Sequence, residues 1–347
     1  MTDHLAPPDA TGRPDTPPAP TAPPPVLRVE GLSVRFRMRG GKEVAAVSDA
    51  RFTLGPGECL ALVGESGCGK SVLASALLGL LPGNAVATGS ARLADGLDLL
   101  DADERTLART VRGRRVGLVP QSPAAHLTAV RTVRSQLRET VRALTRTPRA
   151  ALAGATEAAA ARAAFPASHL DRHPHELSGG LAQRAATALA LVGDAPLLLA
   201  DEPTTGLDRE LVERTVDELR AHTRQADRAL LMITHDLAAA RRIADTVAVM
   251  YAGRIVELAP AEAFFGTPGP RHPYARGLLE ALPERSFTPI PGTPPELGAL
   301  PPGCAFAARC PAAGPACAER PAFTGGLACH HPLTPAPPTT APEADRA

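Results

Sequence analysis

The stretch that decides the fold is Gly64-Glu65-Ser66-Gly67-Cys68-Gly69-Lys70-Ser71, which follows the apolar run Cys59 to Val63 and precedes the helix-like VLASALLGLL. Glycines at these positions let successive backbone N–H groups turn inward around phosphate oxygens, and the start of the following helix adds its dipole. Lys70 can reach the β- and γ-phosphates, and Ser71 can bind Mg²⁺. The strand, loop and helix order favours a phosphate-binding P-loop over a chance glycine-rich turn.

The sequence around this loop predicts an α/β fold with a mainly parallel sheet. Upstream, VLRVEGLSVRF alternates apolar and polar residues from Val26, as in a half-exposed strand. Downstream, short apolar runs at 116–119, 197–200 and 230–234 are separated by helix-like stretches. VAVMYAGRIVEL then predicts a small hairpin that turns at Ala252 and Gly253.

Composition argues against two classes of protein. The 37 Lys and Arg nearly balance the 36 Asp and Glu, and the chain has ten aromatic residues with no Trp, which disfavours a nucleic-acid binder. No run of 18 apolar residues occurs, and the N-terminus lacks the order of a signal peptide. We therefore expect a soluble, cytoplasmic protein of 347 residues whose 37 Pro lie mostly near its ends.

Two further motifs carry chemistry. Asp201 and Glu202 end the apolar run from Leu197, where carboxylates are tolerated if a magnesium–nucleotide complex satisfies them. Asp201 suits the Mg²⁺ side, and Glu202 could activate the attacking water. Ser178, Gly179 and Gly180 predict a capped helix start open to an anion. One nucleotide does not need two cradles from one chain, so this second cradle most simply serves the nucleotide of a partner subunit.

The segment between Gln121 and Ser178 predicts an all-helical insertion. Apolar residues recur there at helical spacing, at Val130, Val133, Leu137, Val141 and Leu144. Residues 105–149 also hold eleven Arg and one Glu. Such a segment could bind nucleic acid or anionic lipid, but a solvated helix face with arginine stems along its edge is the simpler interpretation.

These motifs together resemble a known family. GESGCGKS, Gln121 in VPQSP, LSGGLAQR, LLLADEP, TTGLD and His235 in ITHD stand in the order of the Walker A, Q-loop, signature, Walker B, D-loop and switch-histidine motifs. The chain resembles an ATP-binding subunit of an ABC transporter. The resemblance implies that Phe36 stacks on adenine, that Gln121 touches Mg²⁺ and water, and that His235 contacts the γ-phosphate. It also implies that Ser178 and Gly180 act on the ATP of the opposite subunit.

The C-terminal part resembles one branch of that family, the oligopeptide/dipeptide and nickel importers, through RHPYARGLLEALP and PIPGTPPELGALPPGCAFAARCP. The resemblance includes Cys304, Cys310, Cys317 and Cys329, and some members of the branch carry a [4Fe–4S] cluster there. Four thiolates suit such a cluster, whereas the spacing matches a zinc ribbon poorly. Cysteines with a purely structural role remain the alternative to both metals.

The resulting fold class is an α/β P-loop NTPase core of the ABC ATPase type, with an inserted helical subdomain, a small antiparallel β subdomain and a cysteine-containing C-terminal extension. We expect a disordered Pro-rich tail at 1–25 and an ATPase domain at 26–262 with its helical subdomain at about 122–190. The extension then covers 263–331, and a second disordered tail covers 332–347.

The resemblance implies ATP hydrolysis with ATP and Mg²⁺, coupled to import of peptides, nickel or a metallophore. The expected partners are a second ATPase subunit, either a paralogue or another copy, and two membrane permeases; a solute-binding protein takes part indirectly, and nucleic acid does not. The expected location is the cytoplasmic face of the membrane. The alternatives are an ABC ATPase of translation or DNA repair without a permease, a small-molecule kinase, and an exporter subunit.

Overall fold

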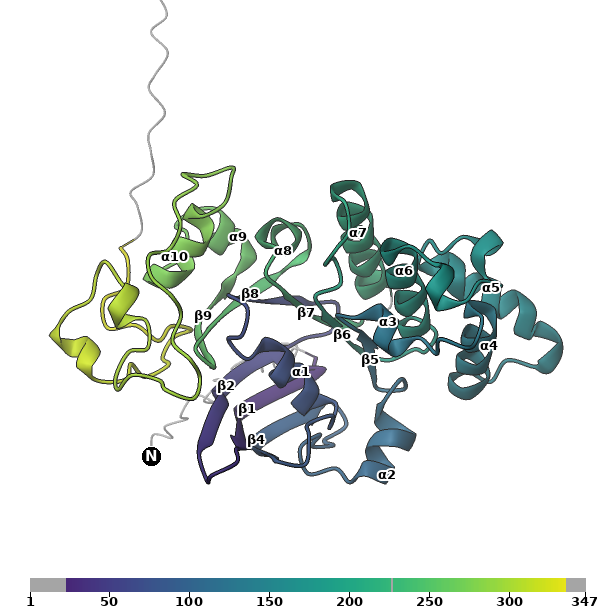
Figure 1. The fold of residues 1–347 in the computed structure, drawn as a ribbon, viewed down its shortest axis with the longest axis horizontal. Coiled ribbons are helices and arrows are strands. Elements are labelled where there is room, and N and C mark those ends of the chain that lie inside the picture. Colours follow the sequence, from purple (N-terminus) through teal and green to yellow (C-terminus); the bar gives the residue numbers. More distant parts are fainter. Residues whose placement is uncertain (1–22, 226, 335–347) are drawn as a thin grey trace, which may run out of the picture.

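Two β-sheets form the framework of the computed structural model, which describes residues 23–225 and 227–334 (Figure 1). Most of both predicted disordered tails, 1–22 and 335–347, lies outside the described residues. In the described part, a six-stranded sheet has the order β5-β6-β7-β3-β8-β9, and a three-stranded sheet has the order β2-β1-β4. The strands are β1 (Leu27–Arg37), β2 (Glu43–Leu54), β3 (Cys59–Val63), β4 (Ala85–Leu93), β5 (Val116–Val119), β6 (Leu197–Asp201), β7 (Ala229–Thr234), β8 (Thr246–Tyr251) and β9 (Arg254–Pro260).

The larger sheet confirms the predicted parallel arrangement. β3 pairs in parallel with β7 and β8, and β6 pairs in parallel with β5 and β7. The short apolar runs are continuous because these strands are covered on both faces: every residue of β3 and β7 is buried. The predicted hairpin is the antiparallel pair β8–β9, which turns at Ala252 and Gly253 with φ of 47° and 80°. Two positive φ values in succession are typical of a tight hairpin turn.

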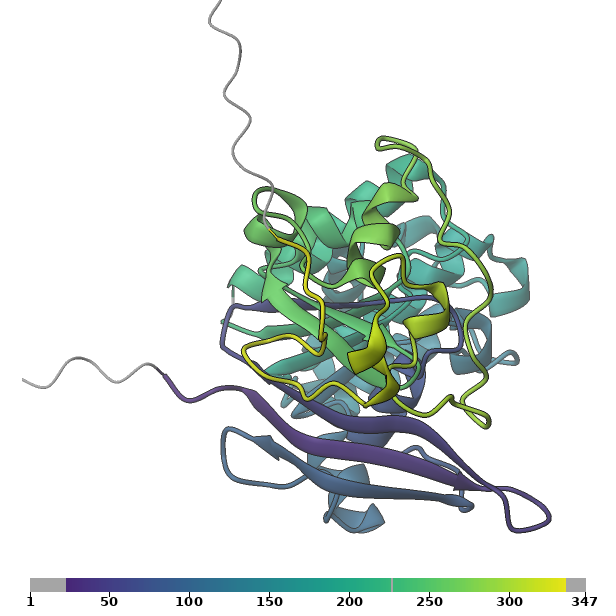
Figure 2. The ribbon, with the colours of Figure 1, turned by 90° about the vertical axis from the view of Figure 1, so that its left-hand side faces the viewer.

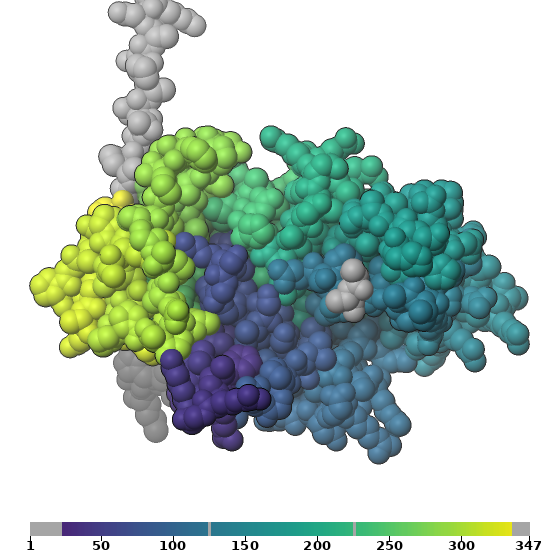
Figure 3. Space-filling view, in the orientation of Figure 1, coloured from purple at the N-terminus to yellow at the C-terminus, as the bar shows by residue number. Residues whose placement is uncertain are grey.

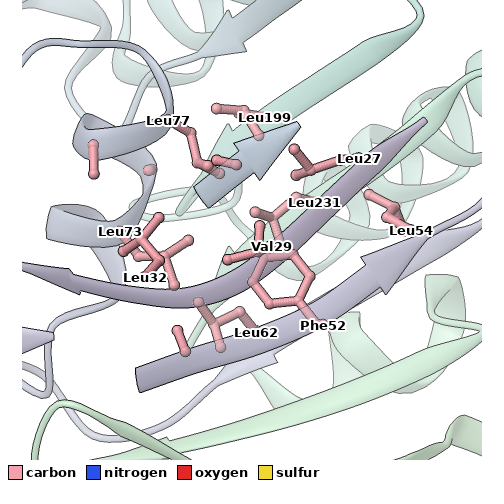
Figure 4. Packing of buried hydrophobic residues seen from close by; sticks show 14 of the residues in the cluster. Leu27, Val29, Leu32, Phe52, Leu54, Leu62, Leu73, Leu77, Leu199 and Leu231 are labelled. Atoms are coloured by element: carbon pink, nitrogen blue, oxygen red, sulfur yellow. The ribbon is translucent and has the colours of Figure 1, made fainter. Parts of the chain in front are cut away.

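The main core lies between the two sheets and includes one face of α1 (Lys70–Leu77). Figure 4 shows side chains of β1 and β2 meeting those of the larger sheet and of α1. This packing holds the helix that begins at Lys70 against both sheets at once. The central contributors are Leu27, Val29, Leu32, Phe52, Leu54, Leu62, Leu73, Leu77, Leu199 and Leu231.

Helices and short turns fill the chain between β5 and β6, as the sequence predicts. They are α3 (Pro123–His126), α4 (Val133–Leu144), α5 (Leu152–Arg162) and α6 (Gly179–Ala190), with 3₁₀ turns at Arg149–Ala151, Ala167–His169 and Pro174–Glu176. Val133, Leu137 and Val141 are buried in a separate apolar cluster of this segment. One detail of the predicted stripe is wrong. Val130 precedes the helix and is 83 % exposed, because α4 begins only after its N-cap at Thr132.

The remaining helices lie before β5 and after β6 in the chain. Before β5 lie α2 (Glu104–Thr106) and a π-helical turn at Leu107–Val111; after β6 come α7 (Arg209–Gln225), α8 (Leu237–Ile243), α9 (Ala261–Phe265) and α10 (Pro273–Glu280). Among the described residues, no helix is long and apolar enough to cross a membrane.

After α10 the chain is irregular apart from 3₁₀ turns at Ala307–Arg309 and Pro315–Ala318. Figure 2 shows this extension, in yellow, in front of the larger sheet. It is attached through the aromatic rings of Tyr251, Tyr274 and Phe306, whose centroids lie 4.5 to 5.4 Å apart. An isolated bridge between Leu327 and Glu257 adds a backbone contact at β9, and a second bridge, between Leu327 and Thr324, lies within the extension.

Candidate functional site

The P-loop runs from the end of β3 to the start of α1 and approaches the backbone of two other strands very closely. A Cβ atom at Gly64, where φ is +154°, would lie 2.2 Å from the carbonyl oxygen of Met250. A Cβ at Gly69, where φ is +108°, would lie 2.3 Å from the carbonyl oxygen of Ala46. Only glycine avoids both the overlap and the backbone strain at these two positions. The glycines therefore seat the loop against β8 and β2.

Lys70 and Ser71 connect this loop to its surroundings. The Lys70 ammonium, in a residue that is 6 % exposed, donates hydrogen bonds to the carbonyl oxygens of Gly64 at 2.7 Å and Glu65 at 3.1 Å. The Ser71 hydroxyl donates to Oδ1 of Asp201 at 3.1 Å. A strand end and a helix start, 130 positions apart, thus meet through their side chains.

A hydroxyl and a carboxylate at this distance form a donor set that suits Mg²⁺, which prefers oxygen ligands. Burial raises the pKa of the Asp201 carboxyl, as does the nearby charge of Glu202, while the hydrogen bond from Ser71 and the charge of Lys70 lower it. A cation beside Asp201 would relieve the cost of burying its charge. The residues present therefore fit the metal that the sequence predicts.

Glu202 and His235 form a second pair of side chains, just after the carboxyl ends of β6 and β7. The Glu202 backbone has φ of +49°, its N–H donates to the carbonyl of Ile233, and the residue is 6 % exposed. Its Oε2 lies 2.6 Å from Nδ1 of His235 and accepts from the Thr205 hydroxyl at 3.3 Å. Because a carboxylate only accepts, Nδ1 carries the proton, and Nε2 is the nitrogen left to meet a substrate. The His235 side chain is 58 % exposed and thus accessible from solution.

Other predicted site residues do not join this cluster. Gln121 is exposed just after β5, and its amide makes no hydrogen bond within residues 23–225 and 227–334. Phe36 is half-buried near the end of β1 and packs against the main core. Neither position contradicts the role implied by the resemblance, and both roles stay predictions.

The signature residues lie on a different part of the molecule. Ser178 caps α6, its hydroxyl accepting from the Leu181 N–H at 3.3 Å, and both Ser178 and Gly179 are exposed. In Figure 1, α6 lies on the side of the larger sheet away from the C-terminal extension. In the part of the chain that the structure describes, no hydrogen bond or ion pair links Ser178, Gly179 or Gly180 to the P-loop. The two helix starts that the sequence predicts to bind anions therefore stay apart within one chain.

The structure does not support the predicted iron–sulfur cluster. All four cysteines of the extension carry free thiols, and no group of three or more His, Cys, Asp or Glu among the described residues is placed to hold a metal ion. Cys317 is buried, whereas Cys304, Cys310 and Cys329 are half-buried, and burial raises the pKa of these three thiols. The placement of these four thiols therefore supports neither an iron–sulfur cluster nor zinc.

Four of the eleven arginines in the arginine-rich segment form ion pairs within the part of the chain that the structure describes. Arg112 pairs with Glu104 and also donates to the carbonyls of Leu78 and Gly79, which ties its element to α1. Further pairs join Arg115 to Asp95, Arg131 to Glu139, and Arg134 to Asp171 and Glu157. This pairing favours the interpretation as a solvated, charged surface.

Sequence reasoning missed two residues at the site. Arg309 and Tyr274, from the C-terminal extension and α10, both contact Glu65 in the P-loop. No local signal in the sequence marks them, because they lie 244 and 209 positions from their partner.

Comparison with known proteins agrees with this geometry. Residues 47–205 match a family described as ABC transporter, and residues 256–317 match one described as the C-terminal region of oligopeptide/dipeptide transporters. The dipeptide transport ATP-binding protein DppD of Bacillus subtilis is 39 % identical over 297 residues, which cover 82 % of this chain and 87 % of that protein. The chain belongs to the ABC transporter ATP-binding subunits. A putative peptide import ATP-binding protein of Brucella ovis is 38 % identical over 314 residues, covering 84 % of this chain and 91 % of that protein.

Solved structures of ABC cassettes share the fold. The dimeric cassette MJ0796, bound to ADP and Pi in a post-hydrolysis state, superimposes with a TM-score of 0.62 at 22 % identity, covering 68 % of this chain and 98 % of that one. The cbiO1 subunit of Clostridium perfringens gives 0.59 at 25 % identity, covering 70 % and 91 %. The predicted ABC ATPase fold and activity are thus confirmed, and none of these relatives supports an ATPase of translation or DNA repair.

The close approach at Gly64 generates a prediction. In Gly64→Ala, overlap with the Met250 carbonyl should displace the loop and weaken ATP binding at least about tenfold, or about 1.4 kcal/mol. The measurement is an equilibrium titration of the full chain with ATP. Gly96→Ala is the control, because Gly96 also has a positive φ of +87° but no atom within 4 Å of the added Cβ. Wild-type affinity in Gly64→Ala would contradict the inferred seating of the loop.

Proposed function

We propose that this ABC transporter ATPase powers the import of peptides. The observation that carries the proposal is the presence, in one chain, of the nucleotide motifs and of a C-terminal region typical of oligopeptide/dipeptide transporters. The relatives described above are named for dipeptide transport or peptide import, which favours peptides over nickel or a metallophore as cargo. In this proposal the chain consists of an ATPase domain at 26–262 and a C-terminal extension at 263–331.

The proposed assembly has two ATPase subunits and two permeases, with this chain on the cytoplasmic face of the membrane and a solute-binding protein acting outside. Each ATP would lie between the P-loop of one subunit and Ser178, Gly179 and Gly180 of the other. The exposure of Ser178 and Gly179, far from their own P-loop, supports this arrangement. A helix start with free N–H groups then stabilises phosphate charge across the interface.

The chemistry we propose is phosphoryl transfer to water. Backbone N–H groups of residues 64–71 and the Lys70 ammonium hold the phosphates, Phe36 stacks on the adenine, and Ser71, Asp201 and Gln121 would hold Mg²⁺. Bound Mg²⁺ neutralises charge that develops on the transferred phosphate. Glu202 orients the attacking water and accepts its proton, and His235, held by Glu202 through Nδ1, points Nε2 toward the γ-phosphate.

Replacing Glu202 tests this assignment. Glu202→Gln keeps the side-chain shape but cannot accept the water proton, so ATP hydrolysis by the assembled transporter should fall by about 10²-fold or more. ATP binding should remain, because no hydrogen bond joins Glu202 to the P-loop in the described part of the chain. Turnover within about threefold of wild type would reject Glu202 as the general base.

A mixing experiment tests whether Ser178 acts on the partner's nucleotide. Lys70→Ala removes the P-loop lysine of one subunit, and Ser178→Arg blocks the helix start of the other. In a mixed dimer one nucleotide site carries both defects and the other carries none, so mixing should restore part of the hydrolysis. If the natural partner is a paralogue, the two substitutions are placed in that pair. Mixed dimers without any recovery would show that Ser178 acts within its own subunit.

Uptake measurements test the cargo. Vesicles containing the assembled transporter and its binding protein should accumulate labelled di- or oligopeptides when ATP is supplied on the cytoplasmic side. Lys70→Ala should abolish this uptake. Accumulation of nickel without peptide would assign the chain to the other cargo of this branch.

A further inference from the structure

An ion pair links the C-terminal extension to the second residue of the P-loop. Arg309 Nη1 lies 2.8 Å from Oε2 of Glu65, and Nη2 lies 3.0 Å from Oε1, which makes the pair bidentate. The side chains are only 5 % and 27 % exposed. Two parallel hydrogen bonds in fixed geometry are among the strongest polar contacts that proteins make. In Figure 3 the extension, coloured yellow-green, lies against the N-terminal part that contains this loop.

The guanidinium is itself held rigidly. Its Nε donates to the Pro291 carbonyl at 2.8 Å, and Nη1 also donates to the Tyr251 hydroxyl at 3.3 Å. The rings of Tyr251 and Phe306 each lie 5.8 Å from the guanidinium carbon. Arg309 therefore reaches Glu65 from a fixed position in the extension.

Every polar group of Glu65 has a partner. The carboxylate binds Arg309, the N–H donates to the hydroxyl of the fully buried Tyr274 at 2.9 Å, and the carbonyl accepts from the Lys70 ammonium at 3.1 Å. Two of these three partners come from chain beyond the hairpin β8–β9. The extension thus fixes the backbone on which the P-loop lysine rests.

We propose that Arg309 is a positioning residue for ATP binding and that the extension sets the affinity of the P-loop through it. This inference rests on the proposed nucleotide site. Arg309 fixes the orientation of Glu65 and neutralises its carboxylate, which stands in a loop built to receive phosphate charge. Without Arg309, an unpaired carboxylate would repel the phosphates, and the loop would lose an anchor on its outer side.

A purely structural role makes a different prediction. If the pair only attaches the extension, losing it lowers thermal stability and leaves ATP affinity unchanged. If Arg309 acts through Glu65, its loss changes affinity, and the size of that change depends on whether Glu65 carries a charge. A double-mutant cycle separates these possibilities.

The cycle uses Arg309→Gln, Glu65→Gln and the double variant in the assembled transporter. Arg309→Gln should raise the KM for ATP about tenfold, with kcat within about threefold of wild type. In the Glu65→Gln background the same substitution should change KM less than about twofold, because no carboxylate is left to neutralise. Equal factors in the two backgrounds, or a lower thermal midpoint with unchanged KM, would overturn the proposal.

Three further variants complete the test. Arg320→Gln is the matched control, since Arg320 is an exposed arginine of the same extension with no ion pair among the described residues, and its KM should stay at the wild-type value. Should Arg309→Gln fail to fold, Arg309→Lys decides: the charge stays but the bidentate geometry is lost, so KM should rise about threefold, and an unchanged KM overturns the proposal. Lys70→Ala should abolish ATP binding; binding that survives it would refute the nucleotide site itself rather than the role of Arg309.

Discussion

The constraint on which the rest of the structure depends is the seating of the P-loop between the two sheets. Gly64 lies against the backbone of β8 and Gly69 against that of β2, each too close for any side chain. The β8–β9 turn reinforces this seat, because the Gly253 N–H donates to the Cys68 carbonyl and the Gly253 carbonyl accepts from Ser48. The position of the loop therefore depends on the positions of both sheets, and the core between them acts as its mechanical support.

The strand order then brings the chemical groups together at the carboxyl ends of the central parallel strands. Strands β6, β7 and β3 are neighbours; Asp201 is the last residue of β6, and His235 and the P-loop follow the carboxyl ends of β7 and β3. Ligands of open α/β sheets bind at the carboxyl ends of the strands, because the loops that follow parallel strands all lie on that side of the sheet. The P-loop and Asp201 could be predicted from sequence because each belongs to a contiguous motif marked by an apolar run, whereas His235 could be assigned only through the resemblance of the whole motif set to the ABC family. The pairing of Ser71 with Asp201 then follows from the topology.

Three features could not be predicted from the sequence: the first residue of a helix, the meaning of the cysteine spacing, and contacts between residues far apart in the chain. Val130 fits the helical period of α4, yet the N-cap at Thr132 excludes it, since periodicity locates a helix better than its first residue. The spacing of the four cysteines is ambiguous: it allows a metal site, but the path of the irregular chain decides whether the four thiols come together. The partners of Glu65 could not be predicted because no sequence periodicity connects residues that are more than 200 positions apart.

The contact between Arg309 and Glu65 also constrains how the two parts of the chain can vary. Removing one partner of a fully buried ion pair leaves an uncompensated charge at a cost of about 3–5 kcal/mol. The cost is smaller for this pair, because the Glu65 side chain is 27 % exposed and solvent screens its charge. Loss of Glu65 leaves the buried Arg309 guanidinium without its carboxylate, whereas loss of Arg309 leaves a partly exposed carboxylate that water can solvate. Because Arg309 is buried, it needs the Glu65 carboxylate of the P-loop as its partner. The ion pair therefore makes the extension depend on the P-loop as well as attaching the two to each other. A conformational change that moves the extension away from Tyr274 and Tyr251 would have to break this pair, and it would do so at the residue whose carbonyl holds Lys70.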